Sequence, residues 1–235
     1  MLLCFGSFIM MPSGEVAMCE LDHRDERAFV SRGGIKLENA LDATGLAVAG
    51  RRALDVGAST GGFTDCLLRR GATGVIAVDV GYGQLDWGLR NDPRVSVLER
   101  TNARALSPEM LPYTPDLVTI DVSFISLAKI LPAALGCLAD PYDVFALIKP
   151  QFEVGRALAS KGRGVIRDPA DRRAALVGVG EAAFGLGASV LGYHSSGLAG
   201  PKGNKETFVW LAEPGRPGGA PNTDEIEKMA RKVEP

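Results

Sequence analysis

The sequence predicts an α/β protein built on a Rossmann-like, seven-stranded, doubly wound sheet. Short β-rich apolar runs alternate with helical segments from residue 53 to residue 211, and turn residues bound each run. Such runs are typical of strands that are buried on both faces of a parallel sheet. A glycine-rich segment, residues 55–63, joins the first run to a helix. Because ligands of doubly wound sheets bind at the carboxyl ends of the strands, this junction is the expected binding edge.

Each element is predicted from its apolar pattern and from the residues that end it. Gly71 fits the position just after a helix, and Pro93 stops another. The expected strands are 53–56, 75–80, 95–98, 116–121, 144–149, 188–193 and 207–211, and the expected helices are 34–44, 62–70, 84–90, 127–138 and 169–186. Residues 150–168 are expected to form a loop, and residues 214–235 a flexible tail that ends in a frayed, charged helix.

Composition and charge restrict the possible functions. The net charge is −2, whereas a nucleic-acid-binding domain usually carries a basic balance, so any RNA contact must come from a local patch. The four cysteines show no CxxC spacing and the two histidines are isolated, so we expect reduced thiols, a cytoplasmic location and no metal site. The apolar first eleven residues are too short to span a bilayer, so no stable membrane insertion is expected.

The glycine-rich segment indicates a nucleoside ligand. Gly57, Gly61 and Gly62 give the spacing G-x-x-x-G-G, which differs from dinucleotide-binding and phosphate-binding loops, and no lysine follows to meet phosphates. Asp79 ends the next strand 22 residues beyond Gly57, where nucleotide-binding sheets place the carboxylate that binds ribose hydroxyls. Asp55 is expected to orient the loop and to meet the amino group of a methionine moiety. The alternative is a structural turn followed by a strand cap.

Nine sequence segments together resemble one known protein family. In chain order they are VSRGGIKLE (30–38), DVGASTGGFT (55–64), VDVGYGQL (78–85), RNDPR (90–94), ERTNAR (99–104), IDVSFISL (120–127), LIKPQFE (147–153), GRGVIRDP (162–169) and GPKGNKE (200–206). Together they resemble the TlyA family, whose members are often labelled haemolysins and which is similar to the FtsJ-like ribose 2′-O-methyltransferases. The match runs from about residue 29 to residue 211.

The resemblance implies a fold of the S-adenosylmethionine-dependent methyltransferase type, with residues 29–213 as the domain. It also implies transfer of a methyl group to cytidine 2′-hydroxyls of 16S and 23S ribosomal RNA, so the expected partners are ribosomal RNA or ribosomal subunits and not DNA. The cofactor, S-adenosyl-L-methionine, is expected to bind Asp55, Gly57, Ala58, Ser59, Gly61, Gly62, Phe63, Asp79, Val80, Asn102 and Asp121. Phe63 fits a stacking group and a core residue equally well.

The family also uses a tetrad of two lysines and two carboxylates, which corresponds here to Lys36, Asp121, Lys149 and Glu206. A ribose hydroxyl is a very weak acid, so its attack on a methyl group needs a base that is held close and aimed in line. Lys149 ends a buried strand, where desolvation and the neighbouring Lys36 would favour a neutral amine. We expect Lys149 to be the base and Lys36 to position the substrate, although the reverse assignment is open. The alternative is two ordinary surface ion pairs.

A basic segment follows the last parallel strand. Residues 149–168 contain five basic and two acidic side chains, which gives a local charge of +3. Such a segment beside the strand ends could bind RNA phosphates, and the alternative is an ordinary mobile loop. The expected RNA-binding residues are Arg32, Arg104, Arg156, Lys161, Arg163 and Arg167.

Residues 1–28 depart from the family pattern. Members normally begin with an S4-type RNA-binding module, which these residues do not fit, so we expect a poorly structured leader or a remnant of that module. Two further functions compete with methyl transfer. A membrane-active haemolysin would need an amphipathic or apolar membrane segment, and only the short leader is a candidate. A non-catalytic RNA-binding protein is disfavoured because all four tetrad positions are filled.

Overall fold

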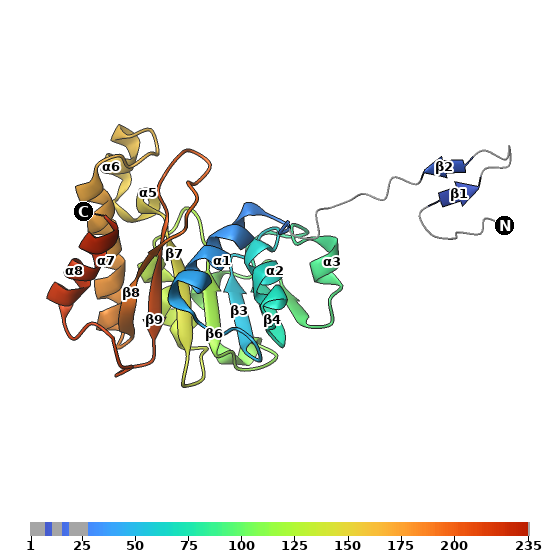
Figure 1. Ribbon diagram of the computed structural model, residues 1–235. Helices are drawn as coiled ribbons and strands as arrows, with labels where there is room; N and C mark the ends of the chain where they lie inside the picture. Colours follow the sequence, from blue (N-terminus) through green and yellow to red (C-terminus); the bar gives the residue numbers. More distant parts are fainter. Residues whose placement is uncertain (1–7, 11–15, 19–27, 235) are drawn as a thin grey trace.

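The structure is a computed structural model that describes residues 8–10, 16–18 and 28–234. Its main sheet has seven strands in the order β5-β4-β3-β6-β7-β9-β8 (Figure 1). The strands are β3 (Arg52–Val56), β4 (Gly74–Val78), β5 (Val95–Leu98), β6 (Leu117–Ile120), β7 (Asp143–Ile148), β8 (Ser189–Ser195) and β9 (Thr207–Ala212). The first five pair in parallel, which confirms the predicted seven-stranded Rossmann-like sheet.

One strand runs against the others. β9 inserts between β7 and β8 and is antiparallel to both, so the sheet is mixed rather than wholly parallel. The reversal follows from the short connection, residues 196–206, which returns the chain directly beside β8. Since β9 begins where β7 ends, with Ile148 opposite Thr207, the residues just before β9 lie at the carboxyl edge of the parallel strands.

Helices cover both faces of the sheet. They are α1 (Arg32–Thr44), α2 (Gly62–Arg69), α3 (Trp87–Arg90), α4 (Leu131–Leu135), α5 (Pro150–Glu153), α6 (Arg156–Lys161), α7 (Pro169–Gly185) and α8 (Thr223–Val233). α1 and α2 pack on one face, whereas α4, α7 and α8 pack on the other (Figure 1). Successive residues of a strand point to opposite faces of the sheet and so join the hydrophobic core on one face or the other. In β3, Ala53 joins the α1–α2 side and Leu54 joins the α7 side.

The start of α1 is fixed by contacts that also place the first lysine of the tetrad. The Ser31 hydroxyl accepts a hydrogen bond from the Gly33 amide at 3.3 Å, and α1 ends at Gly45 in a left-handed conformation. Gly62 of α2 faces this turn, where a Cβ atom would overlap the Ser31 hydroxyl and lie 2.9 Å from the Gly34 amide nitrogen. The close approach of the two helices leaves Lys36 on the side of α1 that faces the strand ends.

Several predicted helices are shorter or divided. The expected helix 127–138 becomes a 3-10 turn, Leu127–Lys129, followed by α4, because Pro132 has no backbone N–H and favours the first turn of a new helix. The expected helix 84–90 begins only at Trp87, since the Asp86 side chain caps the amides of the residues that follow. The expected loop 150–168 contains two short helices, α5 and α6.

The C-terminal helix is packed rather than frayed. Ile226 and Ala230 lie one helical turn apart and are fully buried against α7. Beyond the helix, the Glu234 carboxylate receives two hydrogen bonds from Arg172 of α7, at 2.7 and 2.8 Å. The sequence predicts a frayed helix here because many charged residues surround its narrow apolar stripe, whereas the structure packs that stripe on α7.

Most of the predicted leader, residues 1–28, lies outside the described residues. Within it the structure describes two strands, β1 (Phe8–Met10) and β2 (Val16–Met18), which pair antiparallel.

Candidate active site

A cavity of about 570 Å³ lies beyond the ends of four parallel strands, where the sequence predicts the nucleoside site. Gly57 follows β3, Asp79 and Val80 follow β4, Asn102 follows β5, and Asp121 follows β6. The remaining wall is Ser59, Val78, Gln84, Thr101, Ala103, Val122, Ser123, Phe124, Ile125 and Ile130. The cavity thus combines an apolar wall with a few polar groups, as nucleoside sites do.

Asp79 and Gly57 supply the specific geometry of this cavity. One Asp79 oxygen accepts the Ser59 amide at 2.8 Å, and the other accepts the Gly81 amide at 2.6 Å. Each oxygen keeps a second lone pair, so the fixed carboxylate can still accept hydrogen bonds from ribose hydroxyls. Gly57 has φ +88°, and a Cβ atom there would overlap the carbonyl oxygen of Asp121. Only glycine therefore lets the ends of β3 and β6 approach so closely.

Asp55 does not line this cavity. Its carboxylate is fully buried and accepts hydrogen bonds from the hydroxyls of Thr64 at 2.7 Å and Thr119 at 3.2 Å. Burial raises the pKa of Asp55 to about 7. The carboxyl thus connects β3 to α2 and β6. Its expected roles in orienting the loop and in meeting an amino group of the ligand stay predictions, and in this structure the side chain is buried in the core.

Four further predicted cofactor residues also turn away from the cavity. Phe63 is buried and packs on Phe208, with ring centroids 5.7 Å apart, so it is a core residue. A Cβ atom on Gly61 would overlap Leu89, and Gly62 packs on the start of α1. Ala58 is buried, and its amide donates to the Val78 carbonyl at 3.0 Å. These small residues therefore serve the packing of helices around the loop.

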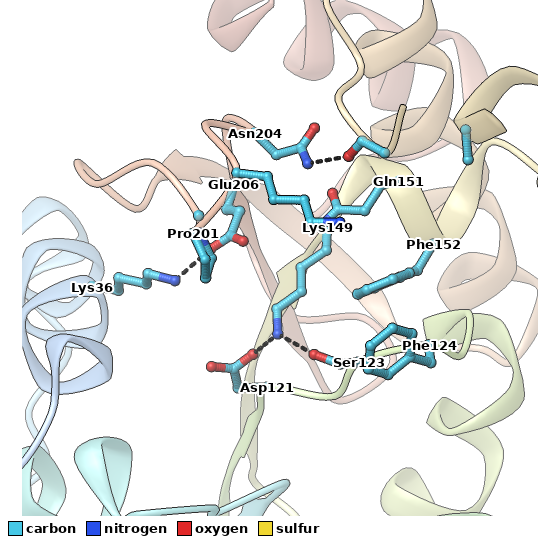
Figure 2. Close-up of a pocket in the computed structure, with 14 residues that line it drawn as sticks. Lys36, Asp121, Ser123, Phe124, Lys149, Gln151, Phe152, Pro201, Asn204 and Glu206 are labelled. Carbon is cyan, nitrogen blue, oxygen red and sulfur yellow. Dashed lines mark hydrogen bonds and ion pairs between the residues drawn. The ribbon is translucent and has the colours of Figure 1, made fainter. Parts of the chain in front are cut away.

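A second cavity, of about 510 Å³, contains all four members of the predicted tetrad (Figure 2). Lys36 comes from α1, Asp121 follows β6, Lys149 follows β7, and Glu206 precedes β9. The Lys36 Nζ atom lies 2.5 Å from Glu206 Oε2, and the Lys149 Nζ atom lies 2.5 Å from Asp121 Oδ1. Lys149 also donates to the Ser123 hydroxyl at 2.9 Å.

Burial distinguishes the Lys36–Glu206 pair from an ordinary surface ion pair, whereas Lys149 and Asp121 are partly buried. Lys36 is 8% exposed and Glu206 is 2% exposed, although both side chains reach the cavity wall. Gly200 makes this burial possible, since a Cβ atom at that position would overlap the Glu206 carboxylate. Desolvated charges are costly unless they are paired, so this arrangement is typical of a functional site rather than of a solvated face.

The two cavities adjoin each other. Asp121, Ser123 and Phe124 line both of them, so the nucleoside cavity opens toward the tetrad along one short loop after β6. Phe124 is 91% exposed, has φ +65°, and its ring centroid lies 5.1 Å from that of Phe152 at the rim (Figure 2). Sequence reasoning did not assign Ser123, Phe124 or Phe152, although all three belong to the segments that carry the family resemblance.

None of the predicted RNA-binding residues whose side chains the structure describes lines the tetrad cavity. Arg32 is exposed and donates to the Ala199 carbonyl at 2.8 Å, on the loop that leads to Glu206. Arg163 and Arg104 are exposed and line two hollows next to the tetrad cavity. Lys161 and Arg167 are exposed on either side of Arg163, whereas the side chain of Arg156 lies outside the described part of the chain.

The seven-stranded sheet, the cavity beyond the carboxyl ends of its parallel strands and the adjoining lysine–carboxylate pairs fit a methyltransferase. The FtsJ-like methyltransferase family matches residues 29–213, and the chain belongs to this family. It is 57% identical over 186 residues to the 16S/23S rRNA (cytidine-2′-O)-methyltransferase TlyA of Mycobacterium tuberculosis, covering 79% of this chain and 69% of that protein. The predicted resemblance is thereby confirmed.

Solved structures of other proteins share this fold. The crystal structure of a hemolysin candidate from Lactococcus lactis is 43% identical, with a TM-score of 0.81, and the match covers 89% of this chain and all of that one. An S-adenosylmethionine-dependent methyltransferase from Mesorhizobium loti shares the fold alone, at 16% identity and a TM-score of 0.54, with 78% of this chain and 100% of that chain covered.

The described residues contain neither a candidate membrane-spanning helix nor a candidate metal cluster. No helix in the described ranges is both long and apolar enough to cross a membrane. No group of three or more histidine, cysteine, aspartate or glutamate side chains that could hold a metal ion occurs in the same part of the chain.

Proposed function

We propose that this chain is an S-adenosylmethionine-dependent RNA methyltransferase that modifies the ribose 2′-hydroxyl of a cytidine in 16S or 23S ribosomal RNA. The observation that carries the proposal is the shared wall of the two cavities, which puts a nucleoside site directly beside one buried and one partly buried lysine–carboxylate pair. The substrate follows from the name of the M. tuberculosis relative. We further propose that residues 29–213 form the catalytic domain, that the partners are ribosomal RNA or ribosomal subunits, and that the protein works in the cytoplasm.

The residues of the first cavity fit S-adenosylmethionine. Asp79 would hold the ribose hydroxyls with the lone pairs that its two amide contacts leave open. Val80 and Ile130 offer an apolar surface for the adenine, beside Asn102. Gly57 would let the ligand approach the backbone closely. When bound, the cofactor would supply an electrophilic methyl group on its sulfonium sulfur.

Lys149 is best placed to act as the base. Its partners, Asp121 and Ser123, line both cavities, whereas Lys36 and Glu206 line only the tetrad cavity. As a neutral amine, Nζ of Lys149 would accept the proton of the ribose hydroxyl, which makes the hydroxyl oxygen nucleophilic. The Asp121 carboxylate would then stabilise the ammonium that forms, and the Ser123 hydroxyl would keep Nζ aimed at the substrate.

Lys36 and Glu206 would position the substrate ribose from the opposite wall. The Lys36 ammonium can donate to a ribose oxygen while Glu206 compensates its charge. Because both side chains are almost fully buried, their geometry is fixed before the RNA arrives, which lowers the entropy cost of a reactive alignment. The exposed Phe124 ring at the rim offers a face on which a nucleobase can stack.

Methyl transfer to ribosomal RNA tests the proposal. The protein is incubated with tritiated cofactor and with purified ribosomal subunits, and 2′-O-methylated nucleotides are then mapped. We expect methylation of a defined cytidine by the wild type and none by Lys149→Ala, with cofactor affinity nearly unchanged in calorimetry. Lys228→Ala, on the exposed face of α8, is the matched control and should behave as the wild type. No transfer to any RNA despite cofactor binding would refute the proposal.

A further inference from the structure

Two hollows flank the tetrad cavity. The first, of about 350 Å³, is lined by Arg163, Ser160 and three residues that it shares with the tetrad cavity, namely Ala159, Gly164 and Lys202. It therefore continues the tetrad cavity toward α6 and the segment that follows it.

The second hollow, of about 630 Å³, lies on the other side of the aromatic pair. It is lined by Arg104 and Lys129, and it shares Phe124, Phe152, Gln151 and Ala159 with the tetrad cavity. Ala159 lines all three spaces, so the two hollows and the tetrad cavity meet at α6 and form one continuous groove.

Each hollow carries two exposed cations. Arg163 and Lys202 line the first hollow, and Arg104 and Lys129 line the second. Throughout residues 28–234, no carboxylate pairs with any of these four side chains, in contrast to the two compensated lysines of the tetrad cavity. An anionic ligand with charges on both sides of a neutral group matches this pattern, and a polynucleotide strand has that character.

Hydrogen bonds anchor the backbone that follows Arg163. Asn204, which is 2% exposed, donates from its side-chain amide to the Gly164 carbonyl at 2.7 Å and accepts from the Ile166 amide at 2.9 Å. The Arg172 guanidinium donates to the carbonyls of Ile166 and Arg167, at 3.3 and 2.5 Å. The turn beside Arg163 is therefore anchored from two sides, so a phosphate bound there need not order it.

We propose that the groove binds one unpaired RNA strand across its whole length, with the target ribose at the tetrad. The phosphate on one side of the target nucleotide lies between Arg163 and Lys202, and the phosphate on the other side lies between Arg104 and Lys129. This inference rests on the proposed function and extends it. It assigns a phosphate subsite to each side of the target, makes the substrate an internal nucleotide, and adds Lys202 and Lys129 to the RNA-binding residues.

The first experiment compares paired substitutions. The variants are Arg163→Gln with Lys202→Gln, Arg104→Gln with Lys129→Gln, and, as a matched control on α8, Arg231→Gln with Lys232→Gln. We expect each groove variant to raise the KM for RNA about tenfold and to reduce the slope of log affinity against log salt by about 0.7 to 1. The kcat, the cofactor Kd and the melting temperature should stay at the wild-type values, and the control should change nothing.

The second experiment assigns each pair of cations to a phosphate. The RNA carries one uncharged methylphosphonate linkage on either the 5′ or the 3′ side of the mapped cytidine. We expect each variant to lose no further affinity when the phosphate that it contacts is neutralised, but to lose as much as the wild type when the other one is. Additive losses for every combination, or an unchanged salt slope, would overturn the inference. If the wild type methylates no RNA at all, the proposed function fails instead.

Discussion

Replacing Asp55 by asparagine should remove a large part of the pH dependence of folding stability. This carboxyl is fully buried, and no cation is among its hydrogen-bond partners, which are the hydroxyls of Thr64 and Thr119. Burial raises its pKa from the ordinary value of 3.8 to about 7. A threonine hydroxyl can donate or accept, so an asparagine amide can keep both contacts without a charge.

The size and the sign of the effect follow from proton linkage. Below about pH 4 the carboxyl is protonated in the folded and in the unfolded chain, so its full contribution to stability is present. Between pH 4 and pH 7 the unfolded chain releases this proton first, and the free energy of unfolding falls as the pH rises. Each tenfold change in acidity corresponds to about 1.4 kcal/mol, so the fall amounts to at most about 4 kcal/mol.

Urea unfolding between pH 4 and pH 8 measures this effect. The free energy of unfolding of Asp55→Asn should decrease less with rising pH than that of the wild type, and the two curves should diverge most between pH 5 and pH 7. Asp224→Asn removes an exposed carboxylate from α8 and should keep the wild-type slope. Parallel curves for the wild type and Asp55→Asn would show that the buried carboxyl does not hold its proton in the folded state.

Three other substitutions test the site. Gly57→Ala should lower stability and cofactor affinity more than Gly45→Ala. Both positions have positive φ, which costs an alanine about 1–2 kcal/mol, but only Gly57 also lacks room for a Cβ atom. Thermal melts and calorimetry measure the two losses, and equal losses for both variants would argue against this reasoning. Phe124→Ala should leave the melting temperature unchanged and lower kcat/KM for RNA about 5- to 100-fold, as expected for a lost stacking contact, and an unaltered value would contradict the stacking role. Asn204→Ala should abolish the hydrogen-exchange protection of the Ile166 amide, while Asn204→Asp, which keeps an acceptor oxygen, should retain it; protection that survives in both variants would exclude this hydrogen bond.

The sequence predicted the parallel part of the sheet well because those strands are continuous apolar runs. It did not predict that β9 would enter between β7 and β8, since strand order depends on contacts between distant segments. The packing of α8 was missed for a similar reason. Only Ile226 and Ala230 are buried among many charged residues, and their partner, α7, lies far away in the chain.

The tetrad could be located from the sequence because each member belongs to a segment that resembles one family. Which lysine pairs with which carboxylate could not be read from the sequence, because that depends on the approach of α1 to the turn before β9. Gly61 and Gly62 were predicted to contact the cofactor, but the space beside each of them is filled by other parts of the protein. A glycine that admits a ligand and a glycine that admits a neighbouring helix look identical in a sequence, and here both admit protein atoms.

The wall shared by the two cavities has a consequence for inhibitor design. Because Asp121, Ser123 and Phe124 face both spaces, a nucleoside in one cavity and a ribose analogue in the other would need only a short covalent connection. Joining two weak ligands in this way makes the second binding event intramolecular, at an effective concentration of about millimolar. A compound that spans the loop after β6 would therefore occupy both cavities at once and bind more tightly than either of its halves.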